Sequence, residues 1–288
     1  MNVEEAIVFT REAIGGTELS IDADIDARYL LSHVLKKEFT WLKTWHDNEL
    51  SEQQVTALAT LVQRRKKGEP IAYITGEKHF WTLILETNPS TLIPRPETEL
   101  LVETALELLA NKSRAKVLDL GTGTGAIALA IASERNNDVI IASDYVAEAV
   151  QLAQRNAVKN HIGNVTIVQS DWFSNIREDN FDLIVSNPPY VEKNDPHLTR
   201  GDLRFEPSSA LTAEDGGFAD IKTIINEAQN HLVKNGVLLM EHGFEQGERV
   251  RSLLRAAAYN HIETLADLSG IDRITIAVNS ITSPEYVN

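Results

Sequence analysis

Apolar residues recur at helical spacing through the first 75 or so residues of the chain. This spacing predicts a first helix over 3–14, which the glycines at 15 and 16 end, and a second helix over 25–34. Ser51, followed three residues later by Gln54, has the pattern of a capping box. We therefore expect a third helix that begins after Ser51 and ends before Gly68.

The pattern changes after residue 76. Apolar residues over 80–85 alternate or cluster as they do in a short hairpin or strand. Pro96 is well placed as the first residue of a helix that continues through Leu108. We predict a helical N-terminal domain over 1–75, a hairpin or linker segment over 76–96, and a larger domain over 97–288.

Strand and helix patterns alternate from Lys116 onward. Such alternation predicts an α/β fold, with a mostly parallel sheet covered by helices on both faces. Helices are expected between most of the strands, among them Ala126–Glu134, Ala147–Lys159 and 218–233. The seven predicted strands are Lys116–Leu120, 139–143, Val165–Gln169, Phe181–Ser186, 237–241, 262–266 and 273–278.

Composition excludes several classes of protein. The chain has 288 residues, of which 43% are hydrophobic, and this is enough for an ordinary buried core. It contains no cysteine, so it has no disulfide framework, thiolate metal site or catalytic thiol. The eight histidines show no metal-ligand spacing, and no metal is expected. No apolar run approaches the roughly 18 residues of a membrane span, and the first residues are acidic where a signal peptide is basic. We therefore expect a cytoplasmic protein without membrane contacts.

Charge narrows the choice of partner. There are 27 Lys and Arg residues against 42 Asp and Glu residues, a net charge of −15. Proteins that bind naked nucleic acid use cations to neutralise phosphates, so stable binding to nucleic acid is not expected. One basic run, over 64–67, lies at the end of the third predicted helix. It either complements the helix dipole or forms a docking patch for an acidic or nucleic-acid-bearing partner.

A glycine-rich loop over 119–125, with the sequence DLGTGTG, follows a predicted strand and precedes a predicted helix. Glycines let a backbone turn tightly and approach a ligand, and the helix N-terminus presents free N–H groups to an anionic group. Asp144 lies about 20 residues later, at the end of the next strand, where a carboxylate can accept hydrogen bonds from ribose hydroxyls. The loop also satisfies the dinucleotide pattern G-x-G-x-x-G/A, so nicotinamide and S-adenosylmethionine enzymes both remain possible at this point.

A second motif, Asn-Pro-Pro-Tyr over 187–190, follows the fourth predicted strand and faces the same crevice. The two prolines stiffen the turn and remove two backbone donors, which leaves carbonyl oxygens free to accept. Asn187 adds a side-chain oxygen, and Tyr190 offers a ring for stacking. Two acceptors of this kind can grip a planar –NH2 group and align the lone pair of its nitrogen. The motif therefore favours methylation of an amide or an exocyclic amine.

Together these two motifs resemble the class I S-adenosylmethionine-dependent amino methyltransferases. Further motifs resemble the peptide chain release factor glutamine N5-methyltransferases within that class: EPIAYITG at 69–76, LIPRPETE at 92–99, RFEP at 204–207 and EHG at 241–243. The resemblance extends from about residue 20 to about residue 279, and the last ten residues carry no part of it. It implies a Rossmann-like, seven-stranded, mostly parallel methyltransferase sheet with a small all-helical N-terminal domain.

The resemblance also implies roles for individual residues. Asp144 would bind the ribose of S-adenosylmethionine, and Asp171 and Trp172 would flank its adenine. Asn187 would lie beside the cofactor, and with the Pro188 carbonyl it would hold the substrate amide. Pro189 and Tyr190 would complete the substrate site, in which Asn187, Pro188 and Tyr190 are the catalytic residues. The methionine part of the cofactor would lie against Gly121, Thr122, Gly123, Thr124 and Gly125.

The implied substrate is the Gln of the Gly-Gly-Gln loop of a class I release factor, docked on the helical domain of a monomeric enzyme. S-adenosylhomocysteine would be the second product. The alternatives are a methyltransferase for adenine N6 or guanine N2 of nucleic acid that stacks a flipped base on Tyr190, a nicotinamide oxidoreductase, and a non-catalytic partner of release factors. Arg95 either forms an ion pair or contacts a ligand, Glu206 is expected to order a loop, and His242 is not expected to act as a base.

Overall fold

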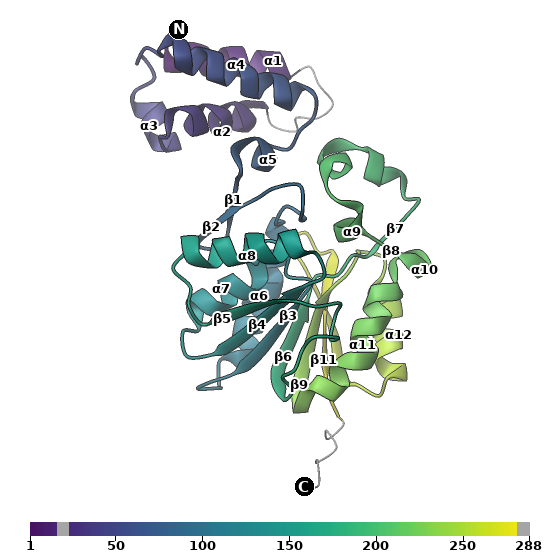
Figure 1. Ribbon diagram of the computed structural model, residues 1–288. Coiled ribbons are helices and arrows are strands. Elements are labelled where there is room, and N and C mark those ends of the chain that lie inside the picture. Colours follow the sequence, from purple (N-terminus) through teal and green to yellow (C-terminus); the bar gives the residue numbers. More distant parts are fainter. Residues whose placement is uncertain (16–22, 281–288) are drawn as a thin grey trace. The chain divides into compact units, whose positions relative to one another are not determined.

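The computed structural model describes residues 1–15 and 23–280, and these form two compact units (Figure 1). One unit contains Met1–Glu77 and Pro196–Phe205, and the other contains Lys78–Asp195 and Glu206–Asn288. Gly16 lies outside the described ranges, and so do residues 281–288, which are eight of the last ten residues. None of the helices in these ranges is both long and apolar enough to cross a membrane.

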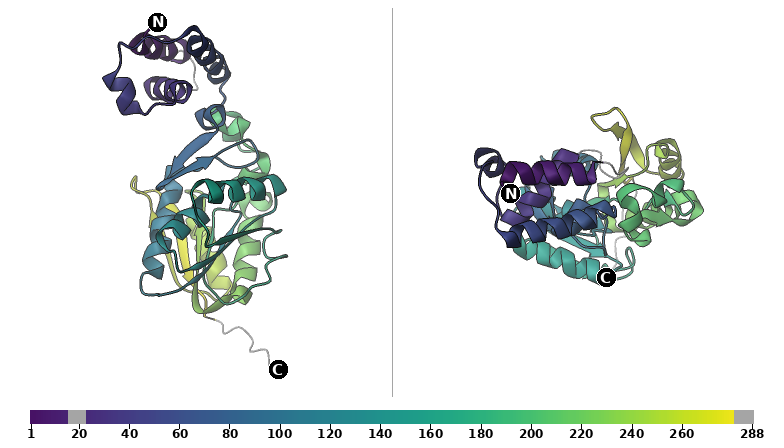
Figure 2. Two further views of the ribbon diagram at one scale, coloured as in Figure 1. Left: turned by 60° about the vertical axis from the view of Figure 1, so that its left-hand side comes forward. Right: turned by 90° about the horizontal axis from the view of Figure 1, so that it is seen from above.

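The first unit is helical, and α1, α2 and α4 lie side by side in each view (Figures 1 and 2). The three helices predicted from apolar spacing are confirmed, and α3 and α5 are additional short helices. The predicted capping box is also present, because Ser51 Oγ accepts from Gln54 N and Gln54 Oε1 accepts from Ser51 N. The helices are α1 (Val3–Ile14), α2 (Ala23–Leu35), α3 (Phe39–Thr44), α4 (Glu52–Lys66) and α5 (Ile71–Thr75).

The basic run at the end of α4 has structural partners within this unit. Arg65 is 5% exposed, and its guanidinium donates to Asp26 and to Asp202 at 2.9 Å each. Arg64 forms an ion pair with Glu69. These contacts bring the segment Pro196–Phe205, with the 3-10 turns η2 (Pro196–Thr199) and η3 (Gly201–Phe205), into the helical unit. Two of the four cations in the run therefore stabilise the fold, and only the two lysines are exposed.

The second unit contains a seven-stranded sheet with the order β10-β11-β9-β6-β3-β4-β5. Neighbouring strands from β9 to β5 pair in parallel, and β11 runs antiparallel to both β9 and β10. The predicted seven-stranded, mostly parallel sheet is therefore confirmed. Its strands are β3 (Lys116–Leu120), β4 (Val139–Asp144), β5 (Val165–Gln169), β6 (Phe181–Ser186), β9 (Leu232–Glu241), β10 (Asn260–Ala266) and β11 (Asp272–Val278).

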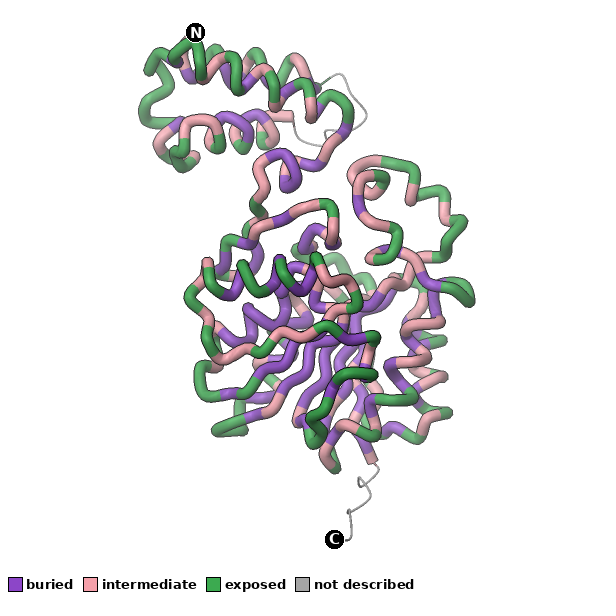
Figure 3. Tube along the Cα trace, viewed as in Figure 1, coloured by how far each residue is buried: buried purple, intermediate pink, exposed green. Residues whose placement is uncertain are grey.

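Helices cover both faces of the sheet because alternate strand residues point to opposite sides. Leu183 and Val185 pack in one apolar cluster with α6 (Glu99–Leu109) and α7 (Ala126–Glu134). Ile184, between them, packs in the other cluster with α11 (Ala219–His231) and α12 (Gly247–Ala256). The end of α8 (Ala147–Lys159) joins the first cluster. Buried positions accordingly follow the central strands (Figure 3).

Short elements complete the fold. The apolar stretch predicted as a hairpin or strand forms the two-stranded sheet of β1 (Glu77–Phe80) and β2 (Leu83–Glu86). Strand β9 begins earlier than predicted, but its regular pairing with β6 starts only at Val237, where the predicted strand starts. The other short elements are η1 (Pro96–Thr98), β7 (Val191–Glu192), α9 (Ser208–Leu211), β8 (Thr212–Ala213) and α10 (Glu214–Gly217).

Candidate functional site

The two motifs leave the sheet side by side. Leu120 at the end of β3 pairs with Ser186 at the end of β6, so the residues that follow them, Gly121 and Asn187, emerge at one point. The chain continues from β3 to β4 on one side of this point, and β6 and β9 lie on the other. In open α/β sheets the crevice at such a switch point is the usual place for a ligand.

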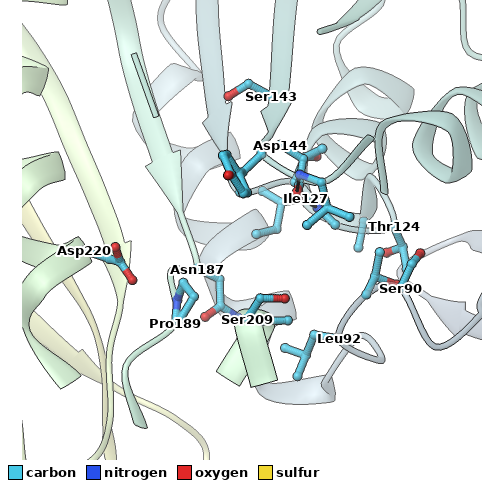
Figure 4. Close-up of a pocket in the computed structure, with 18 of the residues that line it drawn as sticks. Ser90, Leu92, Thr124, Ile127, Ser143, Asp144, Asn187, Pro189, Ser209 and Asp220 are labelled. Carbon is cyan, nitrogen blue, oxygen red and sulfur yellow. Dashed lines mark hydrogen bonds between the residues drawn. The ribbon is translucent and has the colours of Figure 1, made fainter. Parts of the chain in front are cut away.

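A cavity of about 320 Å³ opens at this point (Figure 4). Its volume falls in the range of small-molecule and cofactor sites. Gly125, Pro188 and Tyr190 lie nearby in sequence but do not line it. The predicted site residues that do line it are Gly121, Thr122, Gly123, Thr124, Asp144, Asp171, Trp172, Asn187 and Pro189.

The glycine loop is tied to the end of β4. The Asp144 carboxylate accepts from Gly123 N at 2.8 Å and from Val146 N at 2.9 Å. Gly121 and Gly123 have φ angles of 72° and 55°, which a residue with a Cβ adopts only with strain. A Cβ on Gly121 would lie 3.6 Å from Cζ3 of Trp172. Asp144 therefore shapes the loop as well as facing the cavity, and burial raises its pKa.

Two buried polar atoms at this end of the sheet have no hydrogen-bond partner among the described residues, Asp119 Oδ1 and Ser143 Oγ. Asp119 Oδ2 accepts from Thr122 Oγ1 at 2.6 Å and from Ala128 N at 3.2 Å. Ser143 also lines the cavity, so an unpaired hydroxyl lies beside it. Burial raises the pKa of Asp119 to about 7, because the ionised form loses its hydration.

Asp119 should make stability fall as pH rises. Its folded pKa of about 7 exceeds the ordinary value of 3.8, so the folded state binds more protons than the unfolded state between those pH values. The free energy of unfolding therefore decreases with rising pH across that window. Asp119→Asn keeps the acceptor but cannot ionise, so its loss of stability between about pH 4 and about pH 8 should be smaller. Urea denaturation of both proteins at the two pH values measures this, and equal losses would contradict it.

The 187–190 loop is held by side chains from three other elements. Asn187 Nδ2 donates to Thr98 Oγ1 at 3.2 Å, at the end of η1. Gln246 Nε2, just before α12, donates to the Tyr190 carbonyl at 2.9 Å. The Tyr190 hydroxyl donates to Glu241 Oε1 at 3.4 Å, at the end of β9. Within the described part of the chain, nothing donates to Asn187 Oδ1 or to the Pro188 carbonyl. Both oxygens are therefore available to an outside donor.

Several residues that line the cavity were not predicted as site residues from the sequence. Thr98 and Asp220 line the cavity, as do Ser209 and Ala210 from α9. Asp220 lies beside the Trp172 side chain, and burial raises the pKa of Asp220. In the sequence, an aspartate in the first turn of a helix such as α11 indicates an ordinary solvent-exposed residue. Only the packing of α11 beside the loop after β5 could have identified it.

Three residues with open roles now have partners. Arg95 forms an ion pair with Glu206, whose side chain is fully buried and also accepts from Ile93 N at 3.1 Å. Arg95 lines the cavity as well, so both of its interpretations stay compatible with its position. His242 is buried away from the cavity, where Nε2 contacts Thr275 Oγ1 at 2.8 Å. Burial lowers its pKa, in keeping with a structural role.

Comparison with known proteins identifies the family. The methyltransferase small domain family matches residues 96–267, and the PrmC N-terminal domain family matches residues 18–76. The release factor glutamine methyltransferase of Aliivibrio fischeri is 49% identical over 90% of this chain and 91% of its own length. The enzyme of the same name from Escherichia coli K12 is 49% identical over 92% of this chain and 96% of its own length.

A solved structure supports the fold assignment. A methyltransferase from Pyrococcus furiosus aligns with a TM-score of 0.52 and 18% identity, over 81% of this chain and all of that one. This likeness concerns the fold alone, whereas the sequence relatives cover both units of the chain. The chain belongs to the release factor glutamine methyltransferase family.

Proposed function

We propose that this protein transfers a methyl group from S-adenosylmethionine to the side-chain amide nitrogen of the Gln in the Gly-Gly-Gln loop of a class I release factor. The observation that carries the proposal is the joint exit of Gly121 and Asn187 into one cavity. In this proposal residues 1–75 dock the release factor, residues 76–96 connect the two domains, and residues 97–288 form the catalytic domain. The enzyme acts as a monomer and does not bind nucleic acid stably.

The cavity suits the proposed cofactor. When bound, S-adenosylmethionine supplies an electrophilic methyl group on a sulfonium centre. The backbone over 121–125 would hold its methionine part, and Asp144 would accept from the ribose hydroxyls with the lone pairs that Gly123 and Val146 leave free. Asp171 and Trp172 would flank the adenine. The free Ser143 hydroxyl fits a polar ligand at this end of the sheet.

The substrate amide requires acceptors rather than a base. An amide nitrogen is a poor nucleophile because its lone pair is delocalised, so orientation is the main help that the protein can offer. Asn187 Oδ1 and the Pro188 carbonyl can each accept one N–H of the –NH2 group, which orients the face of the nitrogen toward the cavity. Pro189 and Tyr190 would complete the wall of this site. Positioning of this kind is worth roughly 7–11 kcal/mol in favourable cases.

Asp144→Ala should weaken cofactor binding. The variant loses an acceptor for the ribose, the bond from Gly123 N that holds the glycine loop, and the bond from Val146 N. A hydrogen bond to a charged group is worth about 1.5–3 kcal/mol, so the Kd for S-adenosylhomocysteine should rise by the corresponding factor. Isothermal titration measures the change, and Glu148→Ala, which removes an exposed carboxylate on α8, is the control. An unchanged Kd in Asp144→Ala would remove this residue from the cofactor site.

The substrate is tested with radiolabelled S-adenosylmethionine and a bacterial class I release factor. The matched control is the same factor with the Gln of its Gly-Gly-Gln loop changed to Ala. Label in the first and none in the second supports both the substrate and the residue that accepts the methyl group. Label that enters ribosomal RNA or DNA, with none in the release factor, would overturn the substrate and favour the nucleic-acid alternative.

A further inference from the structure

The Asn187 side chain has a defined partner at one end. An asparagine amide is nearly symmetric in shape, and only its hydrogen bonds decide which end faces a cavity. Its Nδ2 donates to Thr98 Oγ1 at 3.2 Å, and Thr98 is only 4% exposed. With Nδ2 engaged by Thr98, Oδ1 is the end left for an N–H donor in the cavity, which Asn187 and Thr98 both line.

The direction of the Thr98 hydroxyl hydrogen maintains this arrangement. A threonine hydroxyl has one hydrogen, and it can donate or accept. Thr98 Oγ1 donates to Glu241 Oε2 at 2.8 Å. Only lone pairs of Oγ1 then face Asn187, and lone pairs can bind the NH2 end of the amide but not its oxygen. Glu241, the last residue in this series of hydrogen bonds, is well buried, with an exposed fraction of 3%.

We infer that Thr98 and Glu241 are positioning residues for methyl transfer, which hold Asn187 with Oδ1 turned toward the substrate amide. The inference rests on the proposed function, because it matters only if an N–H donor must be held at Asn187. Neither residue needs to touch the reacting atoms. Thr98 lies on η1 and Glu241 at the end of β9, 143 residues later, so the fold brings three separate segments together at this point.

The protonation state of Glu241 should control the arrangement. Burial raises its pKa to about 7, against the opposing hydrogen bonds from Thr98 and Tyr190. Of the charged groups that act on it, Arg273 on β11 lowers the pKa and Glu97 on η1 raises it. A protonated Glu241 can itself donate to Thr98. The Thr98 hydrogen could then turn to Asn187 and favour the flipped amide, so the correct orientation should gain population as pH rises through about 7.

Thr98→Val and Thr98→Ser form a matched pair for the first test. Valine keeps the shape of threonine without the hydroxyl, and serine keeps the hydroxyl. With labelled S-adenosylmethionine at saturation and a class I release factor, the single-turnover rate of Thr98→Val should fall by about tenfold, the worth of one hydrogen bond. The Thr98→Ser rate should stay within a fewfold of wild type. Binding of S-adenosylhomocysteine should change little in either, which separates positioning from cofactor affinity and from misfolding.

Glu241→Gln supplies the second test, and it carries the decision if Thr98→Val does not fold. Glutamine offers Thr98 an acceptor but does not titrate. The wild-type rate should therefore rise between about pH 6 and about pH 8.5, whereas the Glu241→Gln rate should stay level. The inference is overturned if Thr98→Val keeps the wild-type rate, if Thr98→Ser is equally impaired, or if Glu241→Gln retains the rise. A wild-type protein that labels no release factor would instead overturn the proposed function, and with it the inference.

Discussion

Asn187→Ala should lower the rate of methyl transfer by about 10²- to 10³-fold, the usual cost of one aligned group that acts on the reacting centre. The variant removes the one side-chain oxygen that follows β6 into the cavity and is free of other donors in the described structure. The Pro188 carbonyl remains, but one acceptor cannot fix the plane of an –NH2 group. The rate should therefore fall far more than the affinity for S-adenosylhomocysteine.

Single-turnover methylation of a release factor and isothermal titration with S-adenosylhomocysteine measure the two effects separately. Asn194→Ala is the control, because it removes an exposed asparagine a few residues along the same segment. This control should match wild type in both measurements. If Asn187→Ala reduces rate and cofactor binding by the same factor, Asn187 acts on the cofactor rather than on the substrate amide.

The central sheet could be predicted because each of its central strands is encoded by a short run of neighbouring residues. The central parallel strands β3, β4 and β6 are mostly buried and appear in the sequence as short apolar runs, as in Phe181–Ser186. The ends of β3 and β6 also carry the two motifs, so their meeting follows from the usual position of ligands in such sheets. The sequence therefore predicts the glycine loop, Asp144 and Asn187 at one crevice, and the pairing of Leu120 with Ser186 places the two motifs together.

Contacts between distant segments could not be predicted in this way. Thr98 and Glu241 lie in motifs that the family resemblance singled out, but no spacing relates them, and their bond depends on how η1 meets the end of β9. The same holds for Arg65 and Asp202, which join Pro196–Phe205 to the helical unit. A basic run at a helix end suggests an exposed charge, and only the packed structure shows that Arg65 is buried between carboxylates.

Gly217→Ala should impair both folding and methyl transfer, because this glycine packs against the backbone of the 187–190 loop. A Cβ at Gly217 would lie 2.1 Å from the Tyr190 carbonyl oxygen and 2.8 Å from its carbon. Both contacts are with backbone, so the clash cannot be relieved by a rotamer change. Either α10 or the 187–190 loop must move, and the bond from Gln246 Nε2 to the same carbonyl would be strained.

Gly216→Ala is the matched control for this effect. Gly216 and Gly217 have φ angles of 63° and 85°, so alanine at either position carries the left-handed backbone penalty of about 1–2 kcal/mol. A Cβ on Gly216 meets no atom of the described structure within 4 Å, whereas one on Gly217 meets Tyr190. Gly216→Ala should therefore be destabilised only by that backbone penalty and should keep its activity. Gly217→Ala should lose more stability in urea denaturation and, through a displaced Asn187, on the order of 10²-fold in methylation rate. Equal losses in the two variants would show that backbone strain alone, and not contact with the loop, requires glycine at 217.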